Sequence, residues 1–205
     1  MKQNYQLLME KEIEKIKSAG KKPTLLLQCC CAPCSSTVLE RLKEYFKLKL
    51  YFYNPNIYPQ AEYKKRLLQF DKLLPGYEDI EIIKSIYEPD VFENAVKDLE
   101  NEKEGGKRCL KCFYLRLNET ARKAKEIGAD YFCTTLTVSP HKNSEILNQI
   151  GLQAEEKYGI KYLVSDFKKK EGYKRSTIIS NELGLYRQNY CGCKYSIWFN
   201  KEKND

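Results

Sequence analysis

The sequence contains a single histidine, His141, and no long apolar run. Zinc sites commonly draw on histidine, so its scarcity disfavours a site of that kind. No apolar stretch approaches the roughly 18 residues of a membrane span. Residues 1–20 alternate lysine and glutamate with apolar side chains, unlike a secretory signal. The chain is therefore expected to act in the cytoplasm, without a membrane partner.

Length and composition are those of one folded domain. The chain has 205 residues, of which 42% are hydrophobic, and its formal net charge is +8. This composition excludes disordered, collagen-like and coiled-coil chains, and the length supports one core. We expect a single domain over residues 1–205, with a basic, cysteine-containing C-terminal segment from about 166 to 205.

Nine cysteines are an unusually large number for a cytosolic chain of this length. In the cytosol, glutathione and thioredoxin keep structural disulfides rare, so such thiols are better interpreted as metal ligands or redox catalysts. An odd count also leaves one thiol unpaired in any scheme made of disulfides alone.

Short apolar segments alternate with amphipathic ones along the chain. The pattern predicts strands over residues 24–28, 48–53, 80–84, 131–135 and 160–165. It predicts an opening helix that contains Tyr5 to Ile16 and ends near Gly20, and helices over residues 35–46, 60–74, 90–103, 110–127 and 143–158. This alternation indicates an α/β fold, an open and mostly parallel sheet with helices on both faces. In such sheets ligands bind beyond the carboxyl ends of the strands.

The sequence Cys29-Cys30-Cys31-Ala32-Pro33-Cys34 directly follows the first predicted strand. A nucleotide-binding α/β protein has glycines in this loop to hold phosphate, whereas this loop carries thiols. Ser35 or Ser36 is expected to cap the next helix. A helix N-terminus lowers the pKa of a thiol and so favours the thiolate that binds metal. Buried cysteines acting as small apolar side chains are the alternative.

Two further cysteine pairs follow later in the chain. Cys109 and Cys112 form a C-x-x-C motif at a loop-to-helix junction, a pattern shared by zinc sites, iron-sulfur clusters and thioredoxin-like pairs. Cys191 and Cys193 flank one glycine, and a disulfide closing so small a ring would be strained and easily reduced. The second pair is interpreted as a redox pair or as shared metal ligands.

Seven cysteines remain as candidate ligands once structural roles are assigned to Cys29, where the first strand ends, and to Cys133, inside the fourth strand. The seven are Cys30, Cys31, Cys34, Cys109, Cys112, Cys191 and Cys193. One zinc ion takes four ligands, whereas cubane iron-sulfur clusters are held by cysteine thiolates. Seven thiols with almost no histidine favour an iron-sulfur cluster together with a second redox or metal site.

Polar residues follow the fourth and fifth predicted strands. Asp166 comes after the fifth strand, where it serves either as a metal ligand or proton carrier, or as a helix N-cap. Residues 134–143 form a hydroxyl-rich loop that suits phosphate or ribose, although helix capping explains much of it. His141 in that loop is either a proton donor or a surface residue.

Positive charge and aromatic rings gather toward the C-terminus. Three lysines at 168–170, with Lys174, Arg175 and Arg187, are interleaved with Tyr173, Tyr186, Tyr190 and Tyr195. Cations attract phosphates and aromatic rings stack on unpaired bases, a combination suited to single-stranded RNA loops. A merely solvated surface is the alternative. The candidate substrate-binding residues are Arg187, Lys174, Arg175 and Tyr190.

Four segments together resemble the QueH family of epoxyqueuosine reductases. They are Cys30-Cys31-Ala32-Pro33-Cys34, the Cys109/Cys112 pair, Thr134-Thr135-Leu136 with Ser139-Pro140, and Tyr186-Arg187-Gln188-Asn189-Tyr190-Cys191-Gly192-Cys193. The resemblance covers nearly the whole chain beyond the first helix. Gln28 departs from it, because many relatives are expected to have histidine there.

The resemblance implies a Rossmann-like fold similar to that of adenine nucleotide α-hydrolases, with cysteines in place of the nucleotide loop. It also implies a 4Fe-4S cluster and reduction of epoxyqueuosine to queuosine at the wobble position of tRNA. This is the last step of queuosine biosynthesis, here without cobalamin and with an external electron donor.

Residue roles also follow from the resemblance. Cys30, Cys31, Cys109 and Cys112 are the implied cluster ligands, whereas Cys191 and Cys193 are an implied redox-active pair. Cys34 and Asp166 are implied partners of an adjacent mononuclear metal, expected to be iron, and Asp166 is also a candidate proton donor.

Two other classes stay open. A tRNA sulfur-transfer enzyme would share the fold and the cysteines, but should carry an ATP-binding Ser-Gly-Gly-x-Asp loop after the first strand, which this sequence lacks. A zinc-stabilised RNA-binding module would also explain the thiols and the basic surface, and it predicts a colourless protein with stoichiometric zinc.

Overall fold

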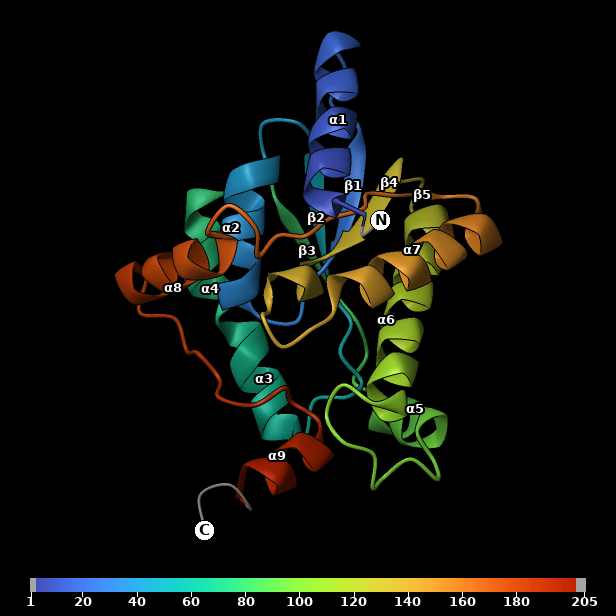
Figure 1. Cartoon of the computed structure of the whole chain (residues 1–205). Coiled ribbons are helices and arrows are strands. Elements are labelled where there is room, and N and C mark those ends of the chain that lie inside the picture. Colours follow the sequence, from blue (N-terminus) through green and yellow to red (C-terminus); the bar gives the residue numbers. More distant parts are fainter. Residues whose placement is uncertain (1–2, 202–205) are drawn as a thin grey trace.

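The computed structural model describes residues 3–201 and the side chains of residues 3–197. Its centre is a parallel five-stranded sheet in the order β3-β2-β1-β4-β5, shown in Figure 1. The strands are β1 (Thr24–Gln28), β2 (Lys47–Phe52), β3 (Glu81–Lys84), β4 (Tyr131–Thr134) and β5 (Lys161–Tyr162). The predicted open α/β sheet is thus confirmed, and it is parallel throughout.

Helices cover both faces of this sheet. They are α1 (Tyr5–Ser18), α2 (Ala32–Leu42), α3 (Gln60–Leu68), α4 (Phe70–Leu73), α5 (Pro89–Ala95), α6 (Lys107–Glu126), α7 (Ser144–Tyr158), α8 (Gly172–Glu182) and α9 (Lys194–Lys201). Two short 3-10 turns, Leu74–Gly76 and Thr135–Val138, complete the elements. None of the helices described is long and apolar enough to cross a membrane.

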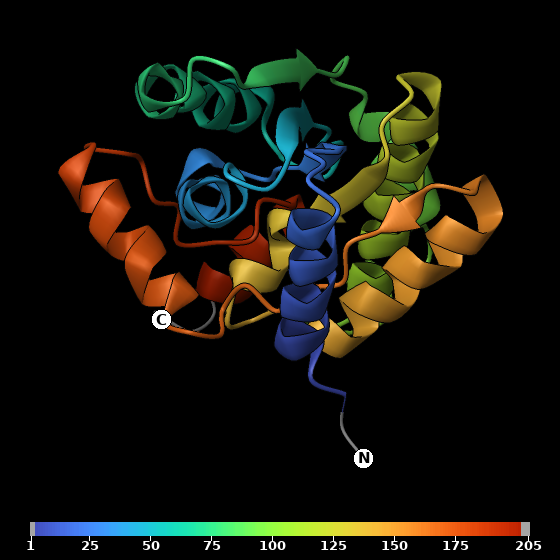
Figure 2. The ribbon, with the colours of Figure 1, turned by 90° about the horizontal axis from the view of Figure 1, so that it is seen from above.

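Alternate side chains of β1 divide the core into two layers. Leu25 and Leu27 join a cluster with apolar residues of α1 and α2, whereas Leu26 joins a cluster with residues of α6 and α7. All three leucines are fully buried. Figure 2 shows α8 alongside α2 on one side of the sheet and α6 with α7 on the other. This double layer fixes the carboxyl ends of the central strands from both faces.

Several element boundaries differ from those predicted. α2 ends at Leu42, and the helix predicted over residues 60–74 is divided into α3, α4 and a 3-10 turn. α5 stops at Ala95, and shortly afterwards Asp98 adopts a left-handed conformation (φ 66°) that a helix does not accommodate. α8 and α9 were not predicted, and residues 202–205 of the predicted basic segment lie outside the described residues.

The fifth strand is much shorter than predicted. The Leu163 amide still donates to the Phe132 carbonyl of β4, but the backbone of Ser165 pairs with the Asn148 side chain of α7. Its Oδ1 accepts from the Ser165 amide over 2.9 Å, and its Nδ2 donates to the Ser165 carbonyl over 2.8 Å. The segment that follows is thereby directed over the carboxyl edge of the sheet.

The strand order reverses between β1 and β4. In open α/β sheets ligands bind in the crevice at this point, beyond the carboxyl ends of the strands. The loops after the two strands meet there, since the Cys30 amide donates to Thr135 Oγ1 over 3.4 Å. Figure 1 shows that the chain after α8 runs back along α3 toward α9. It brings the last two cysteines toward the same edge.

Candidate metal and redox site

The loop after β1 carries the first group of thiols. Cys31 is the N-cap of α2, in extended conformation (φ −169°, ψ 159°). The predicted cap at Ser35 or Ser36 is therefore wrong, because Pro33 fits the first turn of a helix, where an amide donor is not required. Both serine hydroxyls instead donate to backbone carbonyls one turn earlier. Cys34 consequently lies in the first turn of α2.

Cys30, Cys31 and Cys34 form a compact thiol group. Their sulfur atoms all lie within 4.8 Å of one another, and Gln188 Nε2 donates to Cys31 Sγ over 3.1 Å. Hydrogen bonds from the other two thiols hold the pKa of Cys30 well below its ordinary value, and the Arg116 guanidinium lowers it further. The same hydrogen bonds raise the pKa of Cys31 to about 11 and raise that of Cys34. Cys30 thus readily forms the thiolate that binds metal.

Cys109, Cys112, Cys191 and Cys193 form a second thiol group that lines a small cavity. α6 begins at Lys107, earlier than predicted, so both cysteines of the C-x-x-C motif lie in its first turns. Burial raises the pKa of Cys112 to about 12 and also raises those of Cys109 and Cys193. Cys109, Cys112 and Cys193 therefore deprotonate less readily than Cys30 unless a metal cation replaces their protons.

A buried arginine of α6 acts on both thiol groups. Arg116 lies one turn beyond Cys112, is 2% exposed and lowers the pKa of both Cys30 and Cys112. Its Nη2 donates to Asn54 Oδ1 over 2.6 Å, which fixes the guanidinium in place. Sequence reasoning missed this residue, although its spacing of four from Cys112 puts the two side chains on one face of a helix.

Lys142 is a second cation at this site that the sequence analysis missed. It lines the cavity of the second thiol group. Burial alone would lower its pKa, but negative charge on Cys191, Cys30 and Cys34 outweighs burial and raises it. Gln188, three residues before Cys191, donates to Cys31 Sγ over 3.1 Å, so the segment that carries the last cysteine pair passes the first thiol group. The structure thus brings all seven candidate cysteines to one edge of the sheet.

Arg66 of α3 holds the last cysteine pair in position. Its side chain is 1% exposed and pairs with Glu62 over 2.7 Å, and its Nη1 donates to the Cys191 carbonyl. Gly192 has φ 123°, and a Cβ at this position would lie 2.9 Å from Arg66 Nη1. Only glycine fits this backbone beside the guanidinium. Gly192 thus sets the course of the backbone between Cys191 and Cys193.

Cys29 and Cys133 have the structural role expected of them. Both are fully buried, and burial raises the pKa of each thiol. Cys133 Sγ donates to the Leu163 carbonyl over 3.1 Å, and Cys29 Sγ donates to the Leu27 carbonyl over 3.3 Å. These two thiols pack within the sheet rather than facing the others.

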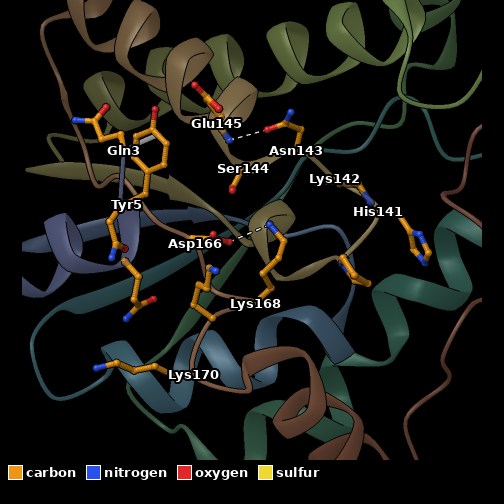
Figure 3. A pocket seen from close by; sticks show the side chains of 14 residues that line it. Gln3, Tyr5, His141, Lys142, Asn143, Ser144, Glu145, Asp166, Lys168 and Lys170 are labelled. Carbon is orange, nitrogen blue, oxygen red and sulfur yellow. Dashed lines mark hydrogen bonds and ion pairs between the residues drawn. The ribbon is translucent and has the colours of Figure 1, made fainter. Parts of the chain in front are cut away.

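Asp166 lies at a larger cavity next to the thiols, shown in Figure 3. Its carboxylate pairs with Lys168 over 2.9 Å. The helix N-cap alternative for Asp166 is wrong, because the next helix, α8, begins only at Gly172. His141 and Lys142 line both this cavity and the thiol cavity. A role of Asp166 as metal ligand or proton carrier stays a prediction.

The predicted RNA-binding residues make contacts within the fold. Arg175 pairs with both carboxylate oxygens of Glu40 in α2, and Arg187 donates to a carbonyl and a hydroxyl of α8. Tyr190 donates to a backbone carbonyl over 3.2 Å, and Lys174 is exposed. The two arginines therefore help to position α8, and RNA binding by these four residues stays a prediction.

The four predicted cluster ligands are divided between the two thiol groups. Cys30 and Cys31 belong to the first group, and Cys109 and Cys112 belong to the second. Cys191 and Cys193 lie with the C-x-x-C pair, and all nine cysteines are free thiols. The ligand set itself stays a prediction.

Comparison with known proteins identifies the family. Residues 25–198 match the family model described as epoxyqueuosine reductase QueH. Curated proteins of that name are similar to this chain. The Streptococcus pyogenes protein is 40% identical over 94% of this chain and 78% of its own length. The Staphylococcus epidermidis protein is 40% identical over 94% of this chain and 84% of its own length. The Thermotoga maritima protein is 38% identical over 88% of this chain and 94% of its own length. The chain therefore belongs to the epoxyqueuosine reductase QueH family.

Proposed function

We propose that this protein is an iron-sulfur oxidoreductase that reduces epoxyqueuosine in tRNA to queuosine, without cobalamin. The observation that carries the proposal is the presence of two thiol groups, one compact and one lining a small cavity, in a chain whose curated relatives are named epoxyqueuosine reductases. A cytoplasmic enzyme with an external electron donor is consistent with so many free thiols.

The chemistry of the donor set fits an iron-sulfur cluster. Thiolates are its usual ligands, and the thiols lie near two cations that offset negative charge, the buried Arg116 and the half-buried Lys142. Cys30, Cys31, Cys109 and Cys112 are the ligands that we propose for the cluster. When bound, a cluster would supply electrons one at a time. Cys34 and Asp166 are the proposed partners of an adjacent mononuclear iron.

The reaction needs a source of two electrons and two protons. Converting an epoxide into an alkene breaks both carbon–oxygen bonds, and the oxygen leaves as water. Oxidation of Cys191 and Cys193 to a disulfide releases two electrons and two protons, which balances this step. The external donor then returns two electrons, and solvent two protons, to restore the thiols. A disulfide across one glycine is strained, so it is readily reduced again.

Charged groups at the edge of the site stabilise and protonate the departing oxygen. The Lys142 ammonium faces the thiols, where it stabilises negative charge on oxygen, and Asp166 at the adjoining cavity is the proposed proton donor. Because Lys142 lines both cavities, these two groups border one continuous region of the surface.

Anaerobic turnover tests the proposed function. The purified protein is supplied with a reductant and tRNA carrying epoxyqueuosine, without cobalamin, and the nucleosides are analysed by mass spectrometry. We expect queuosine to form with wild-type protein and with Cys133→Ala, whose thiol lies in the sheet. Full activity in Cys109→Ala/Cys112→Ala would overturn the cluster assignment. Colourless protein with stoichiometric zinc would favour an RNA-binding module instead.

A further inference from the structure

A cavity of about 800 Å³ lies at the carboxyl edge of the sheet, beside the thiol cavity. Its walls come from the N-terminus of α1, from residues 140–145 after β4 and from residues 166–170 after β5. In Figure 3 the Tyr5 ring stands on one side of this space, opposite Lys142 and His141. The proposed reduction chemistry makes no use of most of this volume.

The lining of this cavity carries an excess of positive charge. Four lysines, at 142 and 168–170, face two acidic residues, Asp166 and Glu145. Lys168 pairs with Asp166, and Lys170 pairs with Glu10 of α1. Lys169 is exposed at the rim and has no carboxylate partner among the residues that the structure describes. An anion entering the cavity therefore meets a cation that no acidic side chain neutralises.

The lysine-bearing loop is held in one conformation by Arg41 of α2. The Arg41 guanidinium donates to the carbonyl oxygens of Lys169 and Lys170, each over 2.9 Å, and of Phe167 over 3.4 Å. Lys170 and Glu171 both have positive φ, 50° and 58°, which non-glycine residues rarely adopt. A fixed loop presents its lysines without a large ordering cost when a ligand binds.

The cavity adjoins the place where the modified base would react. His141 and Lys142 line both cavities, so a ligand that spans them passes this shared wall. In a polynucleotide, each base is separated from its flanking phosphates by one sugar. A base held against the thiols therefore leaves its phosphates within reach of the adjoining lysine-lined space.

We propose that this cavity binds backbone phosphates of the tRNA anticodon loop next to the modified nucleotide. The inference rests on the proposed function, since it presumes that the base enters the thiol site. Lysine ammonium groups act as point charges for phosphate and do not read base identity. The cavity thus supplies affinity for RNA, and the thiol site selects the modified base.

Binding of an anticodon stem-loop RNA hairpin, measured by fluorescence anisotropy, tests this inference independently of turnover. We expect Lys169→Glu to raise the Kd about tenfold and to reduce the slope of log Kd against log salt concentration by about 0.7, as loss of one phosphate contact predicts. Lys169→Arg should restore binding. The matched control is Lys125→Glu, an equal charge reversal at the end of α6 far from Cys109, which should bind like wild type.

Equal Kd values for Lys169→Glu and Lys125→Glu would overturn the inference. The inference would also be overturned if Lys169→Glu abolished saturable binding of adenosine monophosphate but left hairpin binding unchanged. The cavity would then hold a mononucleotide. Turnover separates the two proposals. If wild-type protein reduces epoxyqueuosine and Lys169→Glu binds RNA normally, only the cavity assignment fails. If the hairpin binds as expected but no queuosine forms, only the proposed reaction fails.

Discussion

Arg66 Nη1 donates a hydrogen bond to the carbonyl oxygen of Cys191 over 3.1 Å. This contact joins α3 to the last cysteine pair, which lies in a loop between α8 and α9. The guanidinium is buried and pairs with Glu62, so its orientation is fixed from within the fold. The position of two candidate redox thiols thus depends on a salt bridge outside the thiol groups.

Removing the Arg66 charge should strongly destabilise the protein. Arg66→Leu leaves Glu62 buried without its partner, and breaking such a pair costs about 3–5 kcal/mol. Urea unfolding measures this loss in free energy of unfolding. The double variant Arg66→Leu/Glu62→Leu should recover much of the stability, since no unpaired charge remains. A loss below about 1 kcal/mol in the single variant would contradict the buried pair.

Adding one methyl group at Gly192 should disturb the cysteine turn. A Cβ there would lie 2.9 Å from Arg66 Nη1 and 3.2 Å from Ile57 Cγ1, on a backbone with φ 123°. Gly192→Ala should lose about 1–3 kcal/mol of unfolding free energy. Gly184→Ala is the control: φ is also positive, 57°, but the space is open, so we expect about 1 kcal/mol. Equal losses would show that the contact with Arg66 is unimportant.

The proposed ligand set makes two cysteine double variants behave differently. Cys109→Ala/Cys112→Ala should lose bound iron and sulfide together with activity, because it removes two proposed cluster ligands. Cys191→Ala/Cys193→Ala should keep the cluster but lose turnover, because it removes the proposed redox pair. Iron and sulfide analysis of anaerobically purified protein distinguishes them. Loss of iron in the second variant would instead make Cys191 and Cys193 ligands.

Glu12 should contribute stability that depends on pH. Burial raises its pKa, but hydrogen bonds from Lys161 and Tyr131 outweigh burial and lower the pKa below its ordinary value. A lowered folded-state pKa stabilises the protein above the unfolded-state pKa, and this stability is lost as pH falls through the folded value. Glu12→Gln should therefore cost about 1 kcal/mol at pH 7 and almost nothing in acid.

Urea unfolding at pH 7 and at acidic pH measures this difference. The control is Glu14→Gln on the same helix, whose side chain is 68% exposed and pairs with Lys17 over 3.0 Å. That exposed pair should contribute less than about 0.5 kcal/mol at either pH. A pH-independent cost for Glu12→Gln would contradict a charge-based contribution from Glu12.

The strands and the cysteine positions were predictable because their signals are local. Apolar runs marked β1 to β4 to within about a residue, and the position of Cys30 directly after a strand indicated the edge of the sheet. Arg66 was not predictable, because its role depends on Cys191, which is distant in sequence. Lys142 was hidden in a loop whose hydroxyl groups suggested capping instead. The short β5 depends on the Asn148 side chain of α7, and the strand propensity of residues 160–165 does not reveal this contact.

The order of the elements along the chain has a consequence for synthesis. The sheet is complete at β5, and Cys30, Cys31, Cys34, Cys109 and Cys112 all precede its last strand. Cys191 and Cys193 leave the ribosome after these five cysteines, together with the Cys191 carbonyl that Arg66 contacts. The sheet of a nascent chain can therefore fold, with five of the seven thiols in place, before Cys191 and Cys193 are synthesised. The proposed redox pair is therefore the last part of the candidate site to join the folded sheet.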